Sequence, residues 1–232
     1  MRSFLPRTLV GMSLLLAGCD SSADTDGYRE VACSFWASTH PHFKDLRPAA
    51  GLDAVQVRSS SEPRSTEYPS SSIDAWGQTC ATAGDVSACQ AEVDASRPSE
   101  GFHFSCYSNG ICAYHFLLTT QGDEVRIHST PAAVREVLGT IDTEQEAVLM
   151  VYALGYDFLC YDVDQGGVKA NADGSYDVIG FRGIQCARDI PITQHVFHVS
   201  TSGEVREMES HVLRGGDETC DFEPHLADPV RR

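Results

Sequence analysis

The chain has 232 residues, of which 42% are hydrophobic, and 33 acidic against 17 basic side chains give it a formal net charge of −16. These values are ordinary for a globular protein, and they exclude a disordered polyelectrolyte, a collagen-like chain and a protein with several membrane spans. We expect no nucleic-acid partner, because contacts to phosphates need clustered lysines and arginines.

The first 18 residues have the pattern of an export signal. Arg2 and Arg7 precede an apolar run from Leu9 to Ala17, which is too short to span a bilayer. The sequence LAGC at residues 16–19 resembles the bacterial lipobox. This resemblance implies that residues 1–18 are a signal peptide, cleaved before Cys19, and that Cys19 carries the lipid that anchors the protein. The alternative is an ordinary secretory signal followed by an incidental cysteine.

A lipoprotein of this kind lies outside the cytoplasm, in the cell envelope, on the inner or the outer membrane. Cleavage would remove two arginines and no acid, and it would take the net charge from −16 to −18. That charge repels anionic lipid headgroups, so we expect the lipid on Cys19 to be the contact with the membrane. Residues 19–27 are small and polar and predict a tether, and residues 28–232 predict a single disulfide-stabilised domain.

Helices, loops and one hairpin are expected in the first half of this domain. Tyr28 to Leu46 predicts a first helix, and the serine- and proline-rich residues 59–72 predict an exposed loop. Asp85 can cap a short helix that runs to Ala95. Between residues 101 and 120, two apolar and aromatic runs flank Ser108-Asn109-Gly110, which is typical of a three-residue hairpin loop.

The second half predicts a turn at residues 121–124, a strand over 125–128, and two helices. The first helix has Ser129 or Thr130 as its cap and stops at Gly139; the second has Asp142 as its cap and contains the wholly apolar run 147–154. Strands are then expected over 156–161, 175–181, 192–200 and 204–213. The predicted fold class is α+β: an antiparallel β-meander with a buried helix packed on one face, plus a disulfide-linked hairpin and short helices.

Cysteines support the exported location. Eight remain when Cys19 is set aside, and an even number in an exported protein predicts disulfides. In the hairpin register Cys106 faces Cys112 as a non-hydrogen-bonded pair, where Cα atoms approach to about 4.5 Å and a disulfide can close. The other expected bonds join Cys80 to Cys89, Cys160 to Cys186, and Cys33 to Cys220.

Two further resemblances concern the body of the protein. The order of its elements is similar to that of small cystatin-like or PepSY-like lipoprotein modules. The stretches Trp76 to Val93 and Leu118 to Met150 resemble uncharacterised secreted bacterial lipoproteins. Both resemblances imply an architecture and no particular chemistry.

Histidines are the candidates for a metal site. His103 faces His115 across the hairpin, on the face opposite the cysteines, and an extended His40-Pro41-His42 puts two imidazoles on one face. A metal needs three or four ligands, so each pair would need an acid to complete it. The alternatives are a polar hairpin face and a polar turn.

No motif for catalysis or for a cofactor occurs: the chain lacks Gly-x-Ser-x-Gly, His-Glu-x-x-His, Ser-x-x-Lys, Gly-x-Gly-x-x-Gly and Walker sequences. We therefore predict a lipid-anchored envelope protein without a cofactor, acting as a non-catalytic binding or structural module whose ligand or protein partner the sequence does not name. The alternatives are an envelope hydrolase with an unrecognised site and a histidine-based metal-binding protein.

Overall fold

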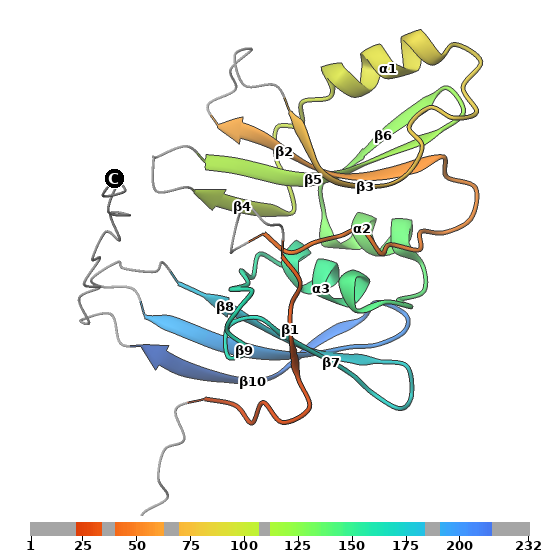
Figure 1. The fold of residues 1–232 in the computed structure, drawn as a ribbon. Coiled ribbons are helices and arrows are strands. Elements are labelled where there is room, and N and C mark those ends of the chain that lie inside the picture. The colour runs from red at the N-terminus through yellow and green to blue at the C-terminus, as the bar shows by residue number, and fades with distance from the viewer. Residues whose placement is uncertain (1–21, 34–39, 63–69, 107–111, 184–190, 215–232) are drawn as a thin grey trace, which may run out of the picture.

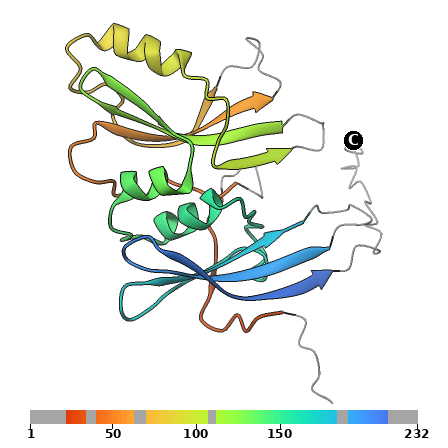
Figure 2. The same cartoon turned by 180° about the vertical axis from the view of Figure 1, so that it is seen from behind.

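The protein has an α+β fold in which two antiparallel sheets enclose a pair of helices (Figure 1). A computed structural model describes residues 22–33, 40–62, 70–106, 112–183 and 191–214. Sheet I has the strand order β3-β2-β5-β4, with β6 also paired to β5, and sheet II has the order β1-β7-β8-β9-β10. Seen from either side, α2 and α3 lie between the sheets and α1 lies on the outer face of sheet I (Figures 1 and 2).

The bounds of the elements are as follows. Sheet I contains β2 (Ala54–Glu62), β3 (Ser71–Gly77), β4 (His103–Cys106), β5 (Cys112–Gln121) and β6 (Glu124–His128). Sheet II contains β1 (Arg29–Glu30), β7 (Gly167–Ala170), β8 (Tyr176–Arg182), β9 (Ile192–Val199) and β10 (Val205–Arg214). The helices are α1 (Val86–Ala95), α2 (Pro131–Leu138) and α3 (Glu144–Ala153).

The helix α3 is the centre of the core. Every residue from Glu146 to Ala153 is buried. A helix that is apolar around its whole circumference must be covered on every side, and here sheet I covers one side and sheet II the other. The largest core cluster accordingly combines Leu117 of sheet I with Val178 and Phe197 of sheet II around this helix.

The beginning of α3 is satisfied by a buried carboxylate. Thr143 is the cap, and its side chain accepts from the backbone N–H of Glu146. The Glu146 carboxylate in turn accepts from the backbone N–H groups of Arg47, Asp142 and Thr143. The sequence predicted a capping box that starts one residue earlier, at Asp142, so the position of the cap was wrong by one residue.

Several expected elements are confirmed. The hairpin has the predicted register, with His103 opposite His115 and Cys106 opposite Cys112, while its loop lies outside the described residues. Asp85 caps α1 and Thr130 caps α2, which ends at Gly139. In sheet II, β8, β9 and β10 pair antiparallel in the expected order, and β7, which no expected strand covers, pairs with β8.

Two expectations in the first half of the chain are wrong. In place of a helix starting at Tyr28, Arg29 and Glu30 pair with β7, and Cys33 forms a bridge with Pro41, because tertiary pairing outweighs the local preference. The loop expected over 59–72 is shorter, since β2 continues to Glu62 and β3 begins at Ser71. The serines of β2 and β3 lie in strands because β2 pairs with β3 on one side and with β5 on the other.

The expected strand over 156–161 is also absent. Only Asp157 makes a bridge, to Phe181, and the chain then turns back on itself before β7. Gly166 allows this close turn, because a Cβ there would lie 2.5 Å from the carbonyl oxygen of Leu159.

Candidate functional site

The cysteines partly follow the expected pairing. Cys80 and Cys89 form the predicted disulfide, with Cα atoms 6.1 Å apart. Cys33 is bonded to Cys160 with Cα atoms 5.6 Å apart, so the expected bonds from Cys33 to Cys220 and from Cys160 to Cys186 are wrong. The correction has a physical reason: β1 pairs with β7 and the backbone N–H of Val31 donates to the carbonyl oxygen of Gly166, which brings Cys33 beside the turn that contains Cys160. Cys186 and Cys220 lie outside the described residues, as does Cys19.

The hairpin cysteines are placed as the register requires. Cys112 is disulfide-bonded, and Cys106 is its partner in the backbone register. The bond between these two cysteines remains the prediction that fits both observations.

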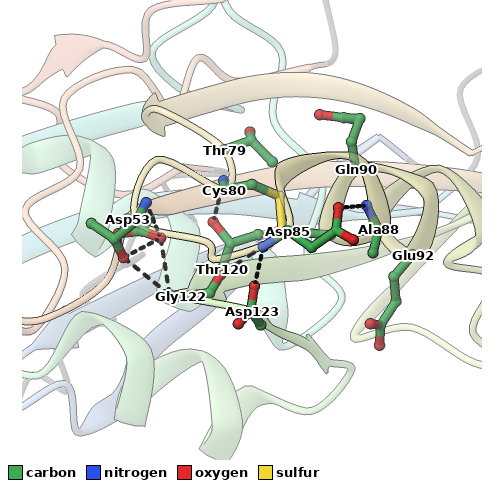
Figure 3. The surroundings of a disulfide bond; sticks show 12 residues. Asp53, Thr79, Cys80, Asp85, Ala88, Gln90, Glu92, Thr120, Gly122 and Asp123 are labelled. Carbon is green, nitrogen blue, oxygen red and sulfur yellow. Dashed lines mark hydrogen bonds between the residues drawn. A yellow bond between two sulfur atoms is a disulfide. The ribbon is translucent and has the colours of Figure 1, made fainter.

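The bond between Cys80 and Cys89 fastens α1 to the outer face of sheet I (Figure 3). Cys80 has a positive φ of 58°, and its backbone N–H donates to the hydroxyl of Thr120 in β5. Around the bond, Asp85 caps α1 and Asp123 accepts from the backbone of Asp85. The two cysteines pack with Val93 of α1 and with Phe116 and Leu118 of β5, so this region is a small second core rather than a reactive site.

Three of the four candidate histidines come together in the space between the sheets. His103 and His115 lie on adjacent strands with their rings stacked 5.5 Å apart, and the ring of His40 meets His115 edge-on at 5.6 Å. Tyr152 of α3 joins the group: its hydroxyl bonds Nδ1 of His115 at 2.5 Å, and its carbonyl oxygen lies 3.1 Å from Nδ1 of His103. We call His40, His103, His115 and Tyr152 the histidine cluster.

One acid lies beside the histidine cluster. Nε2 of His103 is 3.2 Å from a carboxylate oxygen of Asp157, although the contact is not directed as a hydrogen bond. Nδ1 of His103 thus faces a carbonyl oxygen and Nε2 faces a carboxylate, so both ring nitrogens lie beside hydrogen-bond acceptors. His103 is 2% exposed, so its contact with Asp157 is shielded from water on the histidine side.

The other two histidines of the cluster are held neutral. Burial, together with the charges of His103 and His40, places the pKa of His115 well below its usual value. Burial and His103 also lower the pKa of His40, against a smaller opposite effect of Asp157. A neutral His115 accepts from the Tyr152 hydroxyl, which leaves its Nε2 without a hydrogen-bond partner among the described residues.

The histidine cluster does not have the geometry of a metal site. The stacked rings of His103 and His115 are parallel within 3°, so their nitrogens do not converge, and each ring already contacts Tyr152. No group of three or more His, Cys, Asp or Glu residues in the described part of the chain could hold a metal ion. His42, the fourth candidate, lies apart and faces Asp74 at 3.3 Å.

A surface pocket offers a different candidate site. A cavity of about 180 Å³ lies between the inner face of β5 and β6, the segment 49–52 and the end of α2. The wall formed by β5 and β6 is polar, whereas the opposite side combines apolar residues of the segment 49–52 and Val137 with Glu136 of α2. The polar side chains are Thr119, Gln121, Glu124, Arg126, His128 and Glu136; the apolar ones are Ala49, Ala50, Leu52 and Val137.

In the polar wall of the pocket, two pairs of side chains are held together by hydrogen bonds. Arg126 donates to both carboxylate oxygens of Glu124, at 2.5 and 2.8 Å, so its charge is compensated. Nε2 of His128 lies 2.9 Å from the hydroxyl oxygen of Thr119. Burial lowers the pKa of His128, Arg126 lowers it further, and Glu136 opposes both. A neutral His128 can therefore accept a hydrogen bond from Thr119.

Sequence reasoning missed this pocket although part of the signal was present. The turn at residues 121–124 and the strand after it were predicted, and the antiparallel register across that turn places Thr119 opposite Arg126. That register alone would have put the polar residues of β5 and β6 on one face. The position of α2 and the segment 49–52 over this face depends on long-range packing, which the local pattern does not contain.

Comparison of the chain with protein families, with curated proteins and with solved structures finds no match. Within the residues that the structure describes, no helix has both the length and the apolar character that a membrane crossing requires.

The histidine cluster predicts a steep loss of stability in mild acid. The pKa values of His40 and His115 are lowered in the folded state, whereas an unfolded histidine titrates near pH 6.5. Below about pH 6.5 the unfolded chain therefore binds more protons, and each such histidine lowers the unfolding free energy by up to about 1.4 kcal/mol per pH unit. Urea unfolding at pH 7.5, 6.5 and 5.5 measures this slope.

The variant His115→Gln isolates the effect, because glutamine does not titrate. We expect its slope to be smaller than that of the native protein by up to about 1.4 kcal/mol per pH unit. His198→Gln is the control for the loss of a histidine outside the cluster, because it leaves His40 and His115 in place. Equal slopes in the native protein and His115→Gln would contradict the account.

Proposed function

We propose that the protein is a lipid-anchored, extracytoplasmic protein of the bacterial cell envelope that binds a small ligand without catalysis. The lipobox resemblance at Cys19 supports the anchor, and the disulfides at Cys33 and Cys80 are in keeping with an oxidising compartment. The observation that carries the binding role is the pocket beside β5 and β6, with its polar and apolar walls.

The size and chemistry of the pocket limit the ligand. About 180 Å³ admits a small molecule rather than a folded partner. Its polar wall offers hydrogen-bonding groups at Gln121, Thr119 and His128, and Arg126 is already paired with Glu124. We infer a ligand with hydrogen-bonding groups on one side and an apolar surface on the side that meets Leu52 and Val137.

The anchor can be tested by metabolic labelling with a radioactive fatty acid in a bacterial host. We expect the native protein to take up label and to fractionate with membranes. The variant Cys19→Ala should take up no label, because the thiol that accepts the lipid is absent. Label on Cys19→Ala, or an unlabelled native protein, would contradict the anchor.

A second candidate function is hydrolysis, which the contact between Thr119 and His128 favours. A hydroxyl 2.9 Å from a neutral imidazole nitrogen is the arrangement in which histidine acts as a general base toward a nucleophile. The pocket beside this pair gives a substrate access, whereas the histidine cluster is buried.

An assay with small chromogenic esters separates the two functions. Under the binding proposal, the purified soluble body shows no saturable hydrolysis, and Thr119→Val, which has a similar shape and no hydroxyl, behaves as the native protein does. Saturable hydrolysis that disappears in Thr119→Val would contradict the non-catalytic role and assign the pocket to a hydrolase.

A further inference from the structure

The start of the described chain is fixed to the outer face of sheet II. The backbone N–H of Ala23 donates to the side-chain oxygen of Gln194 in β9 at 2.7 Å, and Ala23 packs with Ile179 and Val196. Gln194 is 0% exposed, and its amide nitrogen donates to the carbonyl oxygen of Asp164, so both ends of its amide group are used. The residues expected to form a free tether are therefore held against the body from Ala23 onward.

The attachment continues along the next ten residues. Nζ of Lys169 lies 4.6 Å from the centre of the Tyr28 ring. Burial, with the charges of Asp177, Glu209 and Asp24, raises the pKa of Tyr28 to about 12. β1 then pairs with β7, and Cys33 is bonded to Cys160. Both views show the residues before β1 on the side of sheet II away from α3, and β1 itself at the edge of the sheet (Figures 1 and 2).

This attachment sets how far the body can stand from a lipid on Cys19. Ala23 is four positions after Cys19, and a fully extended chain covers at most about 3.6 Å per position, so the reach is about 14 Å. That is less than two Debye lengths at physiological ionic strength, which are about 16 Å. The fixed segment, and with it the outer face of sheet II, cannot turn far from the headgroups.

Resting on the proposed lipidation of Cys19, we propose that the protein has a fixed orientation, with the outer face of sheet II toward the phospholipid surface. Sheet I, α1 and the pocket beside β5 and β6 then point away from the membrane, open to a ligand. The outer face of sheet II carries Lys169, Asp177 and His198 around the apolar contact of Ala23. A surface of this kind, with both charged and polar side chains, rests on the lipid headgroups and does not insert into the hydrocarbon layer.

The chain offers a convenient reporter, because it contains two lysines, Lys44 and Lys169. Lys169 is on the outer face of sheet II, beside the fixed segment. Lys44 is exposed and follows Phe43, whose backbone N–H donates to Asp74 in β3 of sheet I. An amine-reactive donor dye can thus be placed on Lys169 in the variant Lys44→Arg, or on Lys44 in Lys169→Arg, with its position verified by peptide mass spectrometry.

The experiment measures energy transfer from each dye to an acceptor lipid in phosphatidylcholine vesicles that carry the lipidated protein. Given a reach of about 14 Å, we expect about twofold stronger transfer from Lys169 than from Lys44. Inserting a flexible 20-residue Gly/Ser spacer after Ser22 should weaken both signals and remove most of the difference.

Two failures are distinguishable. Protein that floats with the vesicles but shows equal transfer from both lysines, or stronger transfer from Lys44, overturns the orientation and leaves the anchor intact. Protein that does not float with the vesicles overturns the anchor, and the orientation with it.

Discussion

The fold depends on the burial of one helix on all of its sides. The residues of α3 from Glu146 to Ala153 offer no face that tolerates water, so a single sheet cannot satisfy this helix. Two sheets do so, and each of them uses the helix as part of its own core. Sheet I reaches it through β5 and sheet II through β8 and β9, which makes the two sheets parts of one structure rather than two separate domains.

Such a helix brings polar groups into the core, and each has to be satisfied there. Glu146 uses its buried carboxylate to accept three backbone N–H groups at the start of α3. Tyr152 near its end contacts His103 and His115 of sheet I through its carbonyl oxygen and hydroxyl. Polar groups therefore hold the start of α3 to the segment around Arg47 and its end to the strands of sheet I, and the histidines at that end make its position sensitive to acid.

The sequence predicted elements whose signals are local. The hairpin register follows from a three-residue loop and the period of two, and the caps at Asp85 and Thr130 follow from short-range chemistry. Of sheet I, the strands β2 and β3 were missed because they are rich in serine and other polar residues, and they are strands because β2 pairs with β3 on one side and with β5 on the other. Because α3 is apolar on all sides, its sequence did indicate that a second sheet must cover it, although a single sheet was predicted.

The candidate site was predictable to a smaller extent. That His103 faces His115 followed from the register, but the approach of His40 and Tyr152 depends on how three distant segments pack. The partner of Cys33 could not be derived from spacing, because the bond to Cys160 joins residues 127 positions apart. The pocket likewise forms only because α2 packs over β5 and β6, and this long-range packing could not be derived from the local sequence.

These features combine into one account of the protein. The segment from Ala23 to Cys33 fastens the N-terminal part of the described chain to sheet II, α3 joins sheet II to sheet I, and sheet I with α2 forms the pocket. Native-state hydrogen exchange under increasing denaturant tests the central link, because it compares amides of β5 with amides of β8. The account predicts that both exchange through one global opening, with the same free energy and the same dependence on denaturant. Exchange in β8 through a lower-energy opening that leaves β5 protected would contradict it.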